Sequence, residues 1–207
     1  MIAPKLYYIS QGETKEEHLN HIKKMVLAGV DWVQLRLKNY SEAEVVEIAL
    51  QAQEFCTKHR TKFIINDYLE VAKEIDADGV HLGKEDTCPK KARNILGENK
   101  IVGGTANTLE DCKSLVNSGV DYIGLGPFNF TKTKKKLSPV LGVEGYQFIM
   151  ESLKKQNSTT PIIAIGGITL EDLPNLKNTG VSGVAISGFL HRQEKLAQSI
   201  VTIKEHF

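Results

Sequence analysis

The sequence predicts an α/β fold built from eight strand–helix units, and three observations support it. Short apolar runs alternate with longer amphipathic segments along all 207 residues. The amphipathic segments space their apolar residues near the 3.6-residue helical period, and glycine often follows them. A phrase of the type Gly-Val-Asp recurs before every second apolar run. Because continuous apolar runs are typical of parallel strands buried on both faces, we expect a (β/α)8 TIM barrel.

The strands are expected at the apolar runs 5–10, 32–37, 62–67, 79–83, 100–105, 122–126, 161–167 and 183–188. Amphipathic stretches such as 42–59 and 109–119 supply the helices between them. The recurring phrases "AGVDWVQL", "DADGVHL", "SGVDYIGL" and "TGVSGVAI" each lead from a helix end into an even-numbered strand. No linker or low-complexity tract interrupts the pattern, so we expect one domain over 1–207. A doubly wound open sheet is the alternative.

Composition excludes several classes of function. Lysine and arginine number 26 against 25 acidic residues, so no global positive field would attract nucleic acid or an acidic membrane. Cys56, Cys88 and Cys112 lie far apart, which argues against a disulfide framework or a zinc site. The N-terminus does not resemble a signal peptide, and no apolar run approaches the roughly 20 residues of a membrane span. We expect a soluble cytoplasmic protein with no nucleic-acid or membrane partner.

Cationic side chains alternate at the end of the second predicted strand. Gln34, Arg36 and Lys38 share one face at a period of two. In an ordinary surface strand they would point to solvent. In a barrel the helices cover the outer face, so these residues point into the lumen, where buried cations need an anion.

Carboxylates follow the next two strands. Asn66 and Asp67 end the third strand, and Asp86 comes in the loop after the fourth. Asn66 and Asp67 could simply cap the next helix. Beside cations, however, Asp67 and Asp86 would suit Mg2+ shared with a diphosphate. His81, in the middle of a strand, is interpreted as a hydrogen-bonded interior residue and not as a ligand.

Small polar groups and glycines complete the same rim. Thr105 ends the fifth strand, and glycine-containing turns follow the seventh and eighth strands, a frequent phosphate site in this fold. The stretch "GPFNFTKTKKKLSPVLG" follows the sixth strand. It predicts one anion subsite near Lys134 and another near Thr131 and Thr133, although a solvated loop would have a similar composition. Such a loop could close over two phosphorylated ligands and exclude water.

Together these motifs resemble the thiamine-phosphate synthase family. The likeness runs through "VQLRLK", "FIINDYLEVAKEIDADGVHLGKED", "GGTANT", "DYIGLGPFNFTKTK", "IIAIGGI" and "GVAISG". It implies a Mg2+-dependent transferase that joins two phosphorylated heterocycles, a pyrimidine diphosphate and a thiazole phosphate, to give thiamine phosphate and diphosphate. A homodimer is a further implication.

The resemblance also implies roles for individual residues. Arg36, Lys134 and Thr105 would be catalytic, and Asp67 and Asp86 would bind Mg2+. The pyrimidine diphosphate site would comprise Gln34, Leu35, Arg36, Leu37, Lys38, Asn66, Thr105 and Lys134. The thiazole phosphate site would comprise Thr131, Lys132, Thr133, Gly167, Ile186 and Ser187.

Two positions depart from the family pattern. Thr105 stands where serine is common, which keeps the hydroxyl and adds a methyl group. Lys84 stands where glutamine is common and adds a cation beside the expected metal site. Three alternative functions remain open: a thiazole tautomerase, a phosphosugar epimerase on the same fold, and a non-catalytic sensor of thiamine phosphate.

Overall fold

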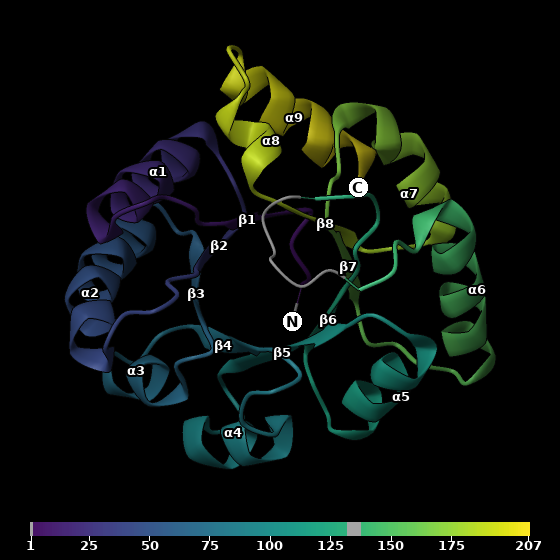
Figure 1. Ribbon diagram of the computed structural model, residues 1–207, viewed down its shortest axis with the longest axis horizontal. Coiled ribbons are helices and arrows are strands. Elements are labelled where there is room, and N and C mark those ends of the chain that lie inside the picture. Colours follow the sequence, from purple (N-terminus) through teal and green to yellow (C-terminus); the bar gives the residue numbers. More distant parts are fainter. Residues whose placement is uncertain (1, 132–137) are drawn as a thin grey trace.

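The computed structural model describes residues 2–131 and 138–207, and it is a closed barrel of parallel strands surrounded by helices (Figure 1). The strands, in barrel order, are β1 Leu6–Ile9, β2 Trp32–Leu35, β3 Lys62–Asn66, β4 Gly79–Leu82, β5 Ile101–Ala106, β6 Tyr122–Leu125, β7 Ile162–Ile165 and β8 Gly183–Ile186. β1 pairs with β8 and closes the barrel. The predicted TIM barrel is confirmed, and the open-sheet alternative is wrong.

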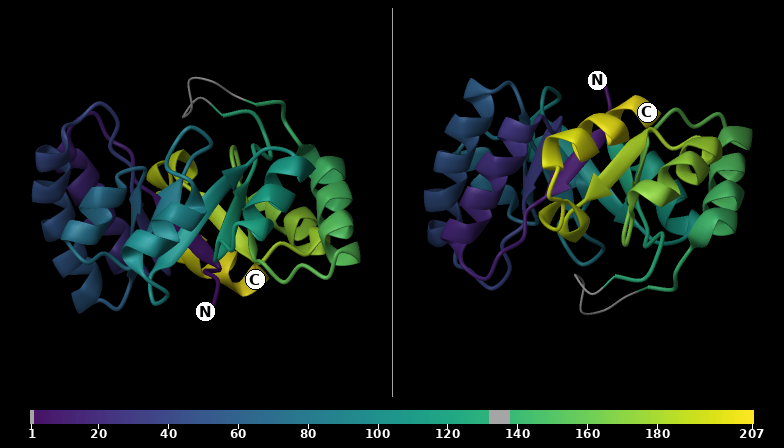
Figure 2. Two further views of the ribbon diagram at one scale, coloured as in Figure 1. Left: turned by 90° about the horizontal axis from the view of Figure 1, so that it is seen from below. Right: turned by 90° about the horizontal axis from the view of Figure 1, so that it is seen from above.

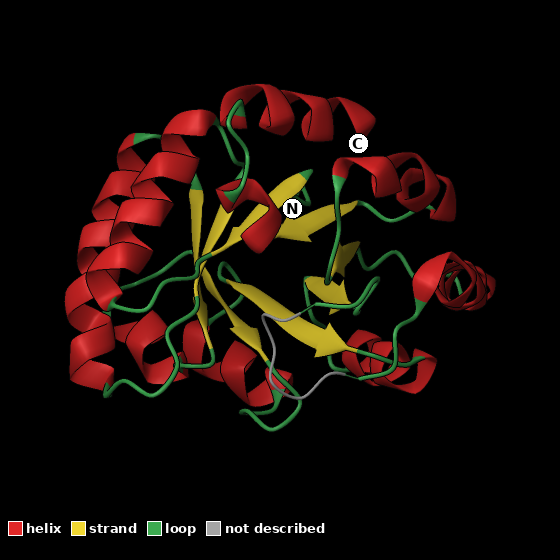
Figure 3. Cartoon of the chain, turned by 45° about the horizontal axis from the view of Figure 1, so that its top comes forward, coloured by secondary structure: helices red, strands yellow, loops and turns green. Residues whose placement is uncertain are grey.

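The helices follow the strands in turn. They are α1 Lys15–Ala28, α2 Glu42–Lys58, α3 Leu69–Glu74, α4 Pro89–Leu96, α5 Leu109–Asn117, α6 Gly142–Lys155, α7 Leu173–Thr179, α8 Gly188–His191 and α9 Leu196–His206, with a short 3-10 turn η1 at Leu170–Asp172. They form a ring outside the strands (Figure 3). Within the described ranges, no helix is both long enough and apolar enough to cross a bilayer.

Two apolar layers hold the barrel together. The larger lies between the strands and the helices. The smaller fills the lumen, where Tyr7, Trp32 and Tyr122 meet edge to face with ring centroids 5.5–5.7 Å apart. Gly103 makes room for this packing, because a Cβ there would lie 2.2 Å from the Tyr122 ring. The lumen is therefore a packed core in its lower part and not a pore.

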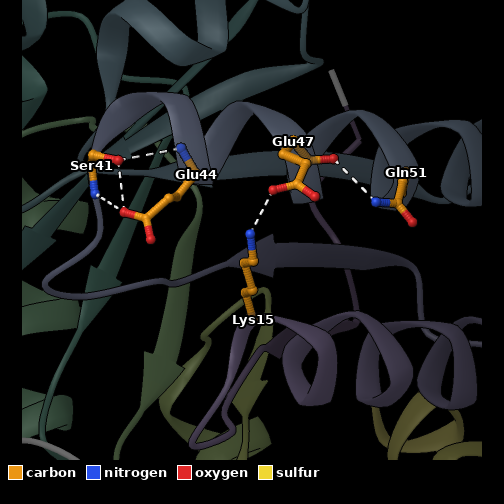
Figure 4. Close-up of polar contacts among 5 residues, drawn as sticks. All are labelled: Lys15, Ser41, Glu44, Glu47 and Gln51. Carbon is orange, nitrogen blue, oxygen red and sulfur yellow. Dashed lines mark hydrogen bonds and ion pairs between the residues drawn. The ribbon is translucent and has the colours of Figure 1, made fainter.

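Local signals fix where helices begin. Ser41 accepts from the Glu44 N–H, and the Glu44 carboxylate returns a bond to Ser41, which forms a capping box at the start of α2 (Figure 4). One turn further, Glu47 pairs with Lys15 of α1 at 2.5 Å. These contacts set the neighbouring α1 and α2 side by side at the surface.

β2 is shorter than the sequence predicted. It ends at Leu35 and not at Leu37, because the Arg36 N–H bonds the Ser10 hydroxyl at 2.9 Å in place of a strand carbonyl. β7 likewise spans only Ile162–Ile165 of the predicted run 161–167, since Gly166 and Gly167 take left-handed conformations. At both places the chain leaves the sheet where site residues were expected.

The two ends of the barrel have different surroundings. Both chain termini lie at the amino end of the strands, whereas the described part of the β6–α6 connection lies on the opposite side (Figure 2). The carboxyl end is therefore clear of the termini and open to the loops that follow the strands.

Candidate active site

A cluster of one cation and two carboxylates lies at the carboxyl end of β2, β3 and β4. Lys38 Nζ forms an ion pair with Asp67, and the carboxyl groups of Asp67 and Asp86 lie within hydrogen-bonding reach of each other. Asp86 also accepts the Gly83 N–H at 2.7 Å. The structure thus brings Lys38, Asp67 and Asp86 together.

The backbone turns sharply to present Asp67. Its φ is 67°, a left-handed conformation that aspartate tolerates better than most residues. Its N–H bonds the His81 carbonyl at 2.9 Å, which continues the β3–β4 pairing for one residue beyond the strand. Asp67 therefore orients a carboxylate toward β4 and does not start α3, whose N-terminal position is occupied by Tyr68.

Electrostatics at the two carboxylates favour a bound cation. Burial and the hydrogen bond with Asp67 raise the pKa of Asp86. Burial alone would raise the pKa of Asp67 too, but hydrogen bonds with Asp86 and Lys38 outweigh it and hold that pKa below its usual range. Two ionised carboxylates at this distance would repel each other, and a metal ion between them would relieve that repulsion.

The donor set fits Mg2+ only with help from a ligand. Across residues 2–131 and 138–207, no group of three or more His, Cys, Asp or Glu side chains is arranged to hold a metal. Two hard carboxylates are, however, the usual protein share of a Mg2+ site completed by phosphate oxygens and water. Asp67 and Asp86 are the residues that could hold the ion.

The remaining site residues at the end of β2 lie either on the inner side of the barrel or in the layer between strands and helices. Arg36 is half-buried at the rim, whereas Gln34 is fully buried and donates to the Tyr7 hydroxyl at 2.9 Å. Leu35 and Leu37 turn outward into the layer between strands and helices. Only the backbone of these two leucines could contact a ligand, because a β-strand sends alternate side chains to opposite faces.

Thr105 and His81 lie together inside the mouth. His81 Nε2 is 2.9 Å from the Thr105 hydroxyl, and His81 Nδ1 is 2.9 Å from the Tyr122 hydroxyl. The interpretation of His81 as a hydrogen-bonded interior residue is confirmed. Asn66, at the end of β3, is 5% exposed and lies opposite His81 in the strand register.

Glycines after β7 meet the loop after β6. Gly166 and Gly167 have φ of 100° and 66°, and a Cβ on Gly167 would lie 2.6 Å from the Phe130 carbonyl oxygen. The Asn129 N–H donates to the Gly166 carbonyl at 2.8 Å. The segment that leads to Thr131 is thus anchored on the turn after β7, and Thr131 itself is half-buried.

The end of β8 contributes its backbone and one hydroxyl. Ile186 is 3% exposed and packs in the outer layer, so its side chain cannot contact a ligand in the mouth. The Ser187 hydroxyl donates to Gln11 Oε1 at 3.1 Å. Lys132, Thr133 and Lys134 fall outside the described residues.

Sequence reasoning missed the loop after β1. Ser10 links the Arg36 N–H to His18 Nδ1, which is 2.7 Å from the Ser10 hydroxyl, and Gln11 contacts Ser187. Burial, together with the nearby charges of His21 and Arg36, lowers the pKa of His18 to about 4. The signal was present in the sequence: Ser10 and Gln11 directly follow the first strand, as the other site residues follow theirs.

Lys84 is paired away from Asp67 and Asp86. Its ammonium pairs with Asp111 at 2.5 Å, in the capping box of α5. The expected extra cation beside the carboxylate pair is therefore directed toward a neighbouring helix.

Comparisons with known proteins show the family of this chain. The family model described as thiamine monophosphate synthase matches residues 6–189. A thiamine-phosphate synthase of Flavobacterium johnsoniae is 48% identical over 92% of this chain and 90% of its own length. One of Flavobacterium psychrophilum is 46% identical over 97% and 98%.

Solved structures include a thiamine phosphate pyrophosphorylase from Pyrococcus furiosus. It superimposes with a TM-score of 0.81 at 28% identity, covering 98% of this chain and 94% of that one. A family match over most of the chain and relatives well above 30% identity lead to one conclusion: the chain belongs to the thiamine monophosphate synthase family.

Proposed function

We propose that this protein is a transferase that joins 4-amino-5-hydroxymethyl-2-methylpyrimidine diphosphate to 4-methyl-5-(2-phosphoethyl)thiazole. The products would be thiamine phosphate and diphosphate. Membership of the family supports the reaction class. The observation that carries the assignment to this mouth is the contact of Lys38, Asp67 and Asp86 beside the half-buried Arg36.

The leaving group would lie at the β2–β5 side of the mouth. Arg36 and Lys38 supply positive charge there, and Thr105 supplies a hydroxyl. Asp67 and Asp86 would hold Mg2+, which when bound would offset the charge of the diphosphate. Preorganised charges of this kind commonly lower a barrier by several kcal/mol. Lys134, which lies outside the described residues, would add to them.

Bond cleavage can precede bond formation in this reaction. The aminopyrimidine ring releases electrons toward its exocyclic methylene, so the C–O bond to diphosphate can break to leave a pyrimidine cation. Arg36 and Lys38 stabilise the departing anion, and no protein nucleophile is required. The thiazole nitrogen then forms the new C–N bond, an advantage of positioning that can be worth roughly 7–11 kcal/mol.

The thiazole phosphate would lie on the opposite side of the mouth. The left-handed turn at Gly166 and Gly167 and the Ser187–Gln11 pair line that side. Backbone N–H groups at glycine turns are ready donors to phosphate. Thr131 leads from the anchored β6 loop toward the same region, with Lys132 and Thr133 following it in sequence.

A direct assay tests the proposal. Purified protein is mixed with both heterocycles and Mg2+, and thiamine phosphate and diphosphate are measured with and without EDTA. We expect equal amounts of both products with Mg2+ and none with EDTA. Conversion of a single thiazole substrate without diphosphate release would favour the tautomerase instead. Tight binding of thiamine phosphate with no turnover would favour the sensor.

A further inference from the structure

A chain of hydrogen bonds crosses the barrel lumen beneath the mouth. It runs from Gln34 of β2 to Tyr7 of β1, then to Tyr122 of β6, His81 of β4 and Thr105 of β5. The four links measure 2.9, 3.0, 2.9 and 2.9 Å. Five strands thus contribute one polar side chain each to a single connected network inside a core that is otherwise apolar.

The side chains of this network are buried, and neighbouring glycines leave space for them. Tyr7, Gln34 and Tyr122 are at most 1% exposed, and His81 is 8% exposed. Gly103 and Gly124 clear the space for it, because a Cβ at either would come within 2.2 Å of the Tyr122 ring or 3.2 Å of the His81 ring. Buried polar groups are costly unless each has a partner, and every member of this network has one.

The first donor, Gln34, determines which group donates and which accepts in each later hydrogen bond of the network. Gln34 Nε2 can only donate, so the Tyr7 oxygen accepts from it. Among the described residues, the Tyr7 hydroxyl hydrogen then has the Tyr122 oxygen as its one acceptor, and we take the bond in that direction. Burial raises the pKa of both phenols, so both keep their protons. The Tyr122 hydroxyl then donates to His81 Nδ1, which leaves the proton of a neutral imidazole on Nε2.

The order of donors and acceptors makes the Thr105 hydroxyl an acceptor from His81. His81 Nε2–H donates to the Thr105 oxygen, so the Thr105 hydroxyl hydrogen must find a different acceptor. Among the described residues, His81 is the only hydrogen-bond partner of that hydroxyl. Thr105 is half-buried at the carboxyl end of β5, on the side of the mouth where the proposed leaving group lies.

We propose that Tyr7, Tyr122 and His81 are positioning residues that fix the Thr105 hydroxyl as a donor to the departing diphosphate. The role rests on the proposed function for its substrate, but the direction of the chain does not. An Nε2-protonated His81 aims the hydroxyl hydrogen outward, whereas the opposite tautomer would aim a lone pair at the anion. Because the donor is oriented before the reaction, no reorganisation is needed when charge develops.

The direction is tested by 15N NMR of the histidine ring in ligand-free protein, with His81 assigned by the signal lost in His81→Gln. The expected result is a neutral imidazole protonated at Nε2, with this tautomer preference lost in Tyr122→Phe. A wild-type His81 protonated at Nδ1 would overturn the proposal. This measurement needs no substrate, so it remains decisive if the proposed reaction is wrong.

The functional role is tested by the isosteric variant Tyr122→Phe, which keeps the ring packing and removes one hydroxyl. We expect kcat to fall about 10-fold with KM for both substrates within about twofold, since orientation of a donor is lost and the donor itself is kept. Tyr146→Phe is the matched control: that phenol is also fully buried but bonds the Leu125 carbonyl in the outer layer, and its kcat should not change.

A double-mutant cycle separates positioning from general loss of packing. Thr105→Val removes the hydroxyl while keeping the shape. If Tyr122 acts through Thr105, adding Tyr122→Phe to Thr105→Val should lower kcat no further. Two effects that multiply, or a folded Tyr122→Phe variant with wild-type kcat, would refute the positioning role.

Discussion

Aspartates occupy both ends of the barrel, but their surroundings differ. At the amino end, Asp31, Asp78 and Asp121 precede β2, β4 and β6. Each carboxylate accepts a backbone N–H from the preceding odd-numbered strand, at Leu6, Phe63 and Val102, with distances of 2.9, 2.9 and 2.7 Å. Each is also paired with a cation, from Lys204, Lys62 or Arg93. These aspartates brace neighbouring strands.

Asp67 and Asp86, at the carboxyl end, have fewer internal donors. Their carboxyl groups lie within hydrogen-bonding reach of each other, and Lys38 is the cation that pairs with Asp67. Only Asp86 accepts a backbone N–H, from Gly83, among the hydrogen bonds of the described residues. The aspartates at the amino end therefore stabilise the fold, whereas Asp67 and Asp86 have fewer partners within the chain.

The largest effect is expected from neutralising Asp67. Asp67→Asn should lower kcat at least 100-fold, because a hard anionic ligand is lost while asparagine still tolerates the left-handed backbone. Urea unfolding should show stability close to that of the native protein. Steady-state assays at saturating Mg2+ measure the first quantity. Near-normal turnover in a folded Asp67→Asn protein would remove Asp67 from the metal site.

At the amino end we expect stability to fall while activity is kept. Asp121→Ala removes the acceptor of the Val102 N–H and the partner of Arg93, which is largely buried. The free energy of unfolding should fall by about 2 to 3 kcal/mol, with kcat unchanged at a temperature where the variant is folded. Chemical denaturation and the product assay check both parts. A loss of kcat in fully folded Asp121→Ala would contradict the purely structural role of Asp121.

Acid should destabilise the carboxyl end through His18. Its pKa is about 4 when folded against an ordinary 6.5, so between these values only the unfolded chain binds the proton. The contribution is fully present above pH 6.5 and is lost as the pH falls toward 4. From pH 7 to pH 5, His18 should account for a loss of nearly 2 kcal/mol of unfolding free energy.

The variant His18→Gln isolates this contribution. The stability difference between pH 7 and pH 5 should shrink by that amount in His18→Gln. His59→Gln, at an exposed histidine on the amino side, is the matched control and should leave the difference unchanged. An unaltered pH dependence in His18→Gln would show that the acid sensitivity originates elsewhere.

The smallest effect is expected at Lys84. Its partner is Asp111 and its side chain is 43% exposed, so Lys84→Gln should cost at most about 0.5 kcal/mol of stability. KM for the pyrimidine diphosphate should stay within about twofold. A rise of tenfold or more would mean that Lys84 leaves Asp111 to bind the diphosphate.

The repeated Gly-Val-Asp phrase predicted where strands lie but not what its aspartates bind. The four phrases located all four even-numbered strands correctly and helped to predict the barrel. Their aspartates looked like turn residues, however, because nothing local indicates that Asp31, Asp78 and Asp121 accept N–H groups from a strand about 15 to 25 residues away. The brace depends on register between strands, which only the closed sheet defines.

The sequence by itself determined the strand–helix alternation, and the carboxyl-end rule then collected Arg36, Lys38, Asp67 and Asp86 at one mouth, because parallel strands all end on the same side. Period-two alternation also placed Gln34, Arg36 and Lys38 on the inner face. Only the tertiary structure decided which partners the side chains find. It packed Leu35, Leu37 and Ile186 against the helices, directed Lys84 to Asp111, and joined Gln34 to Thr105 through the lumen. Those outcomes depend on contacts between strands distant in sequence, where each side chain is fixed by what the opposite wall of the barrel offers.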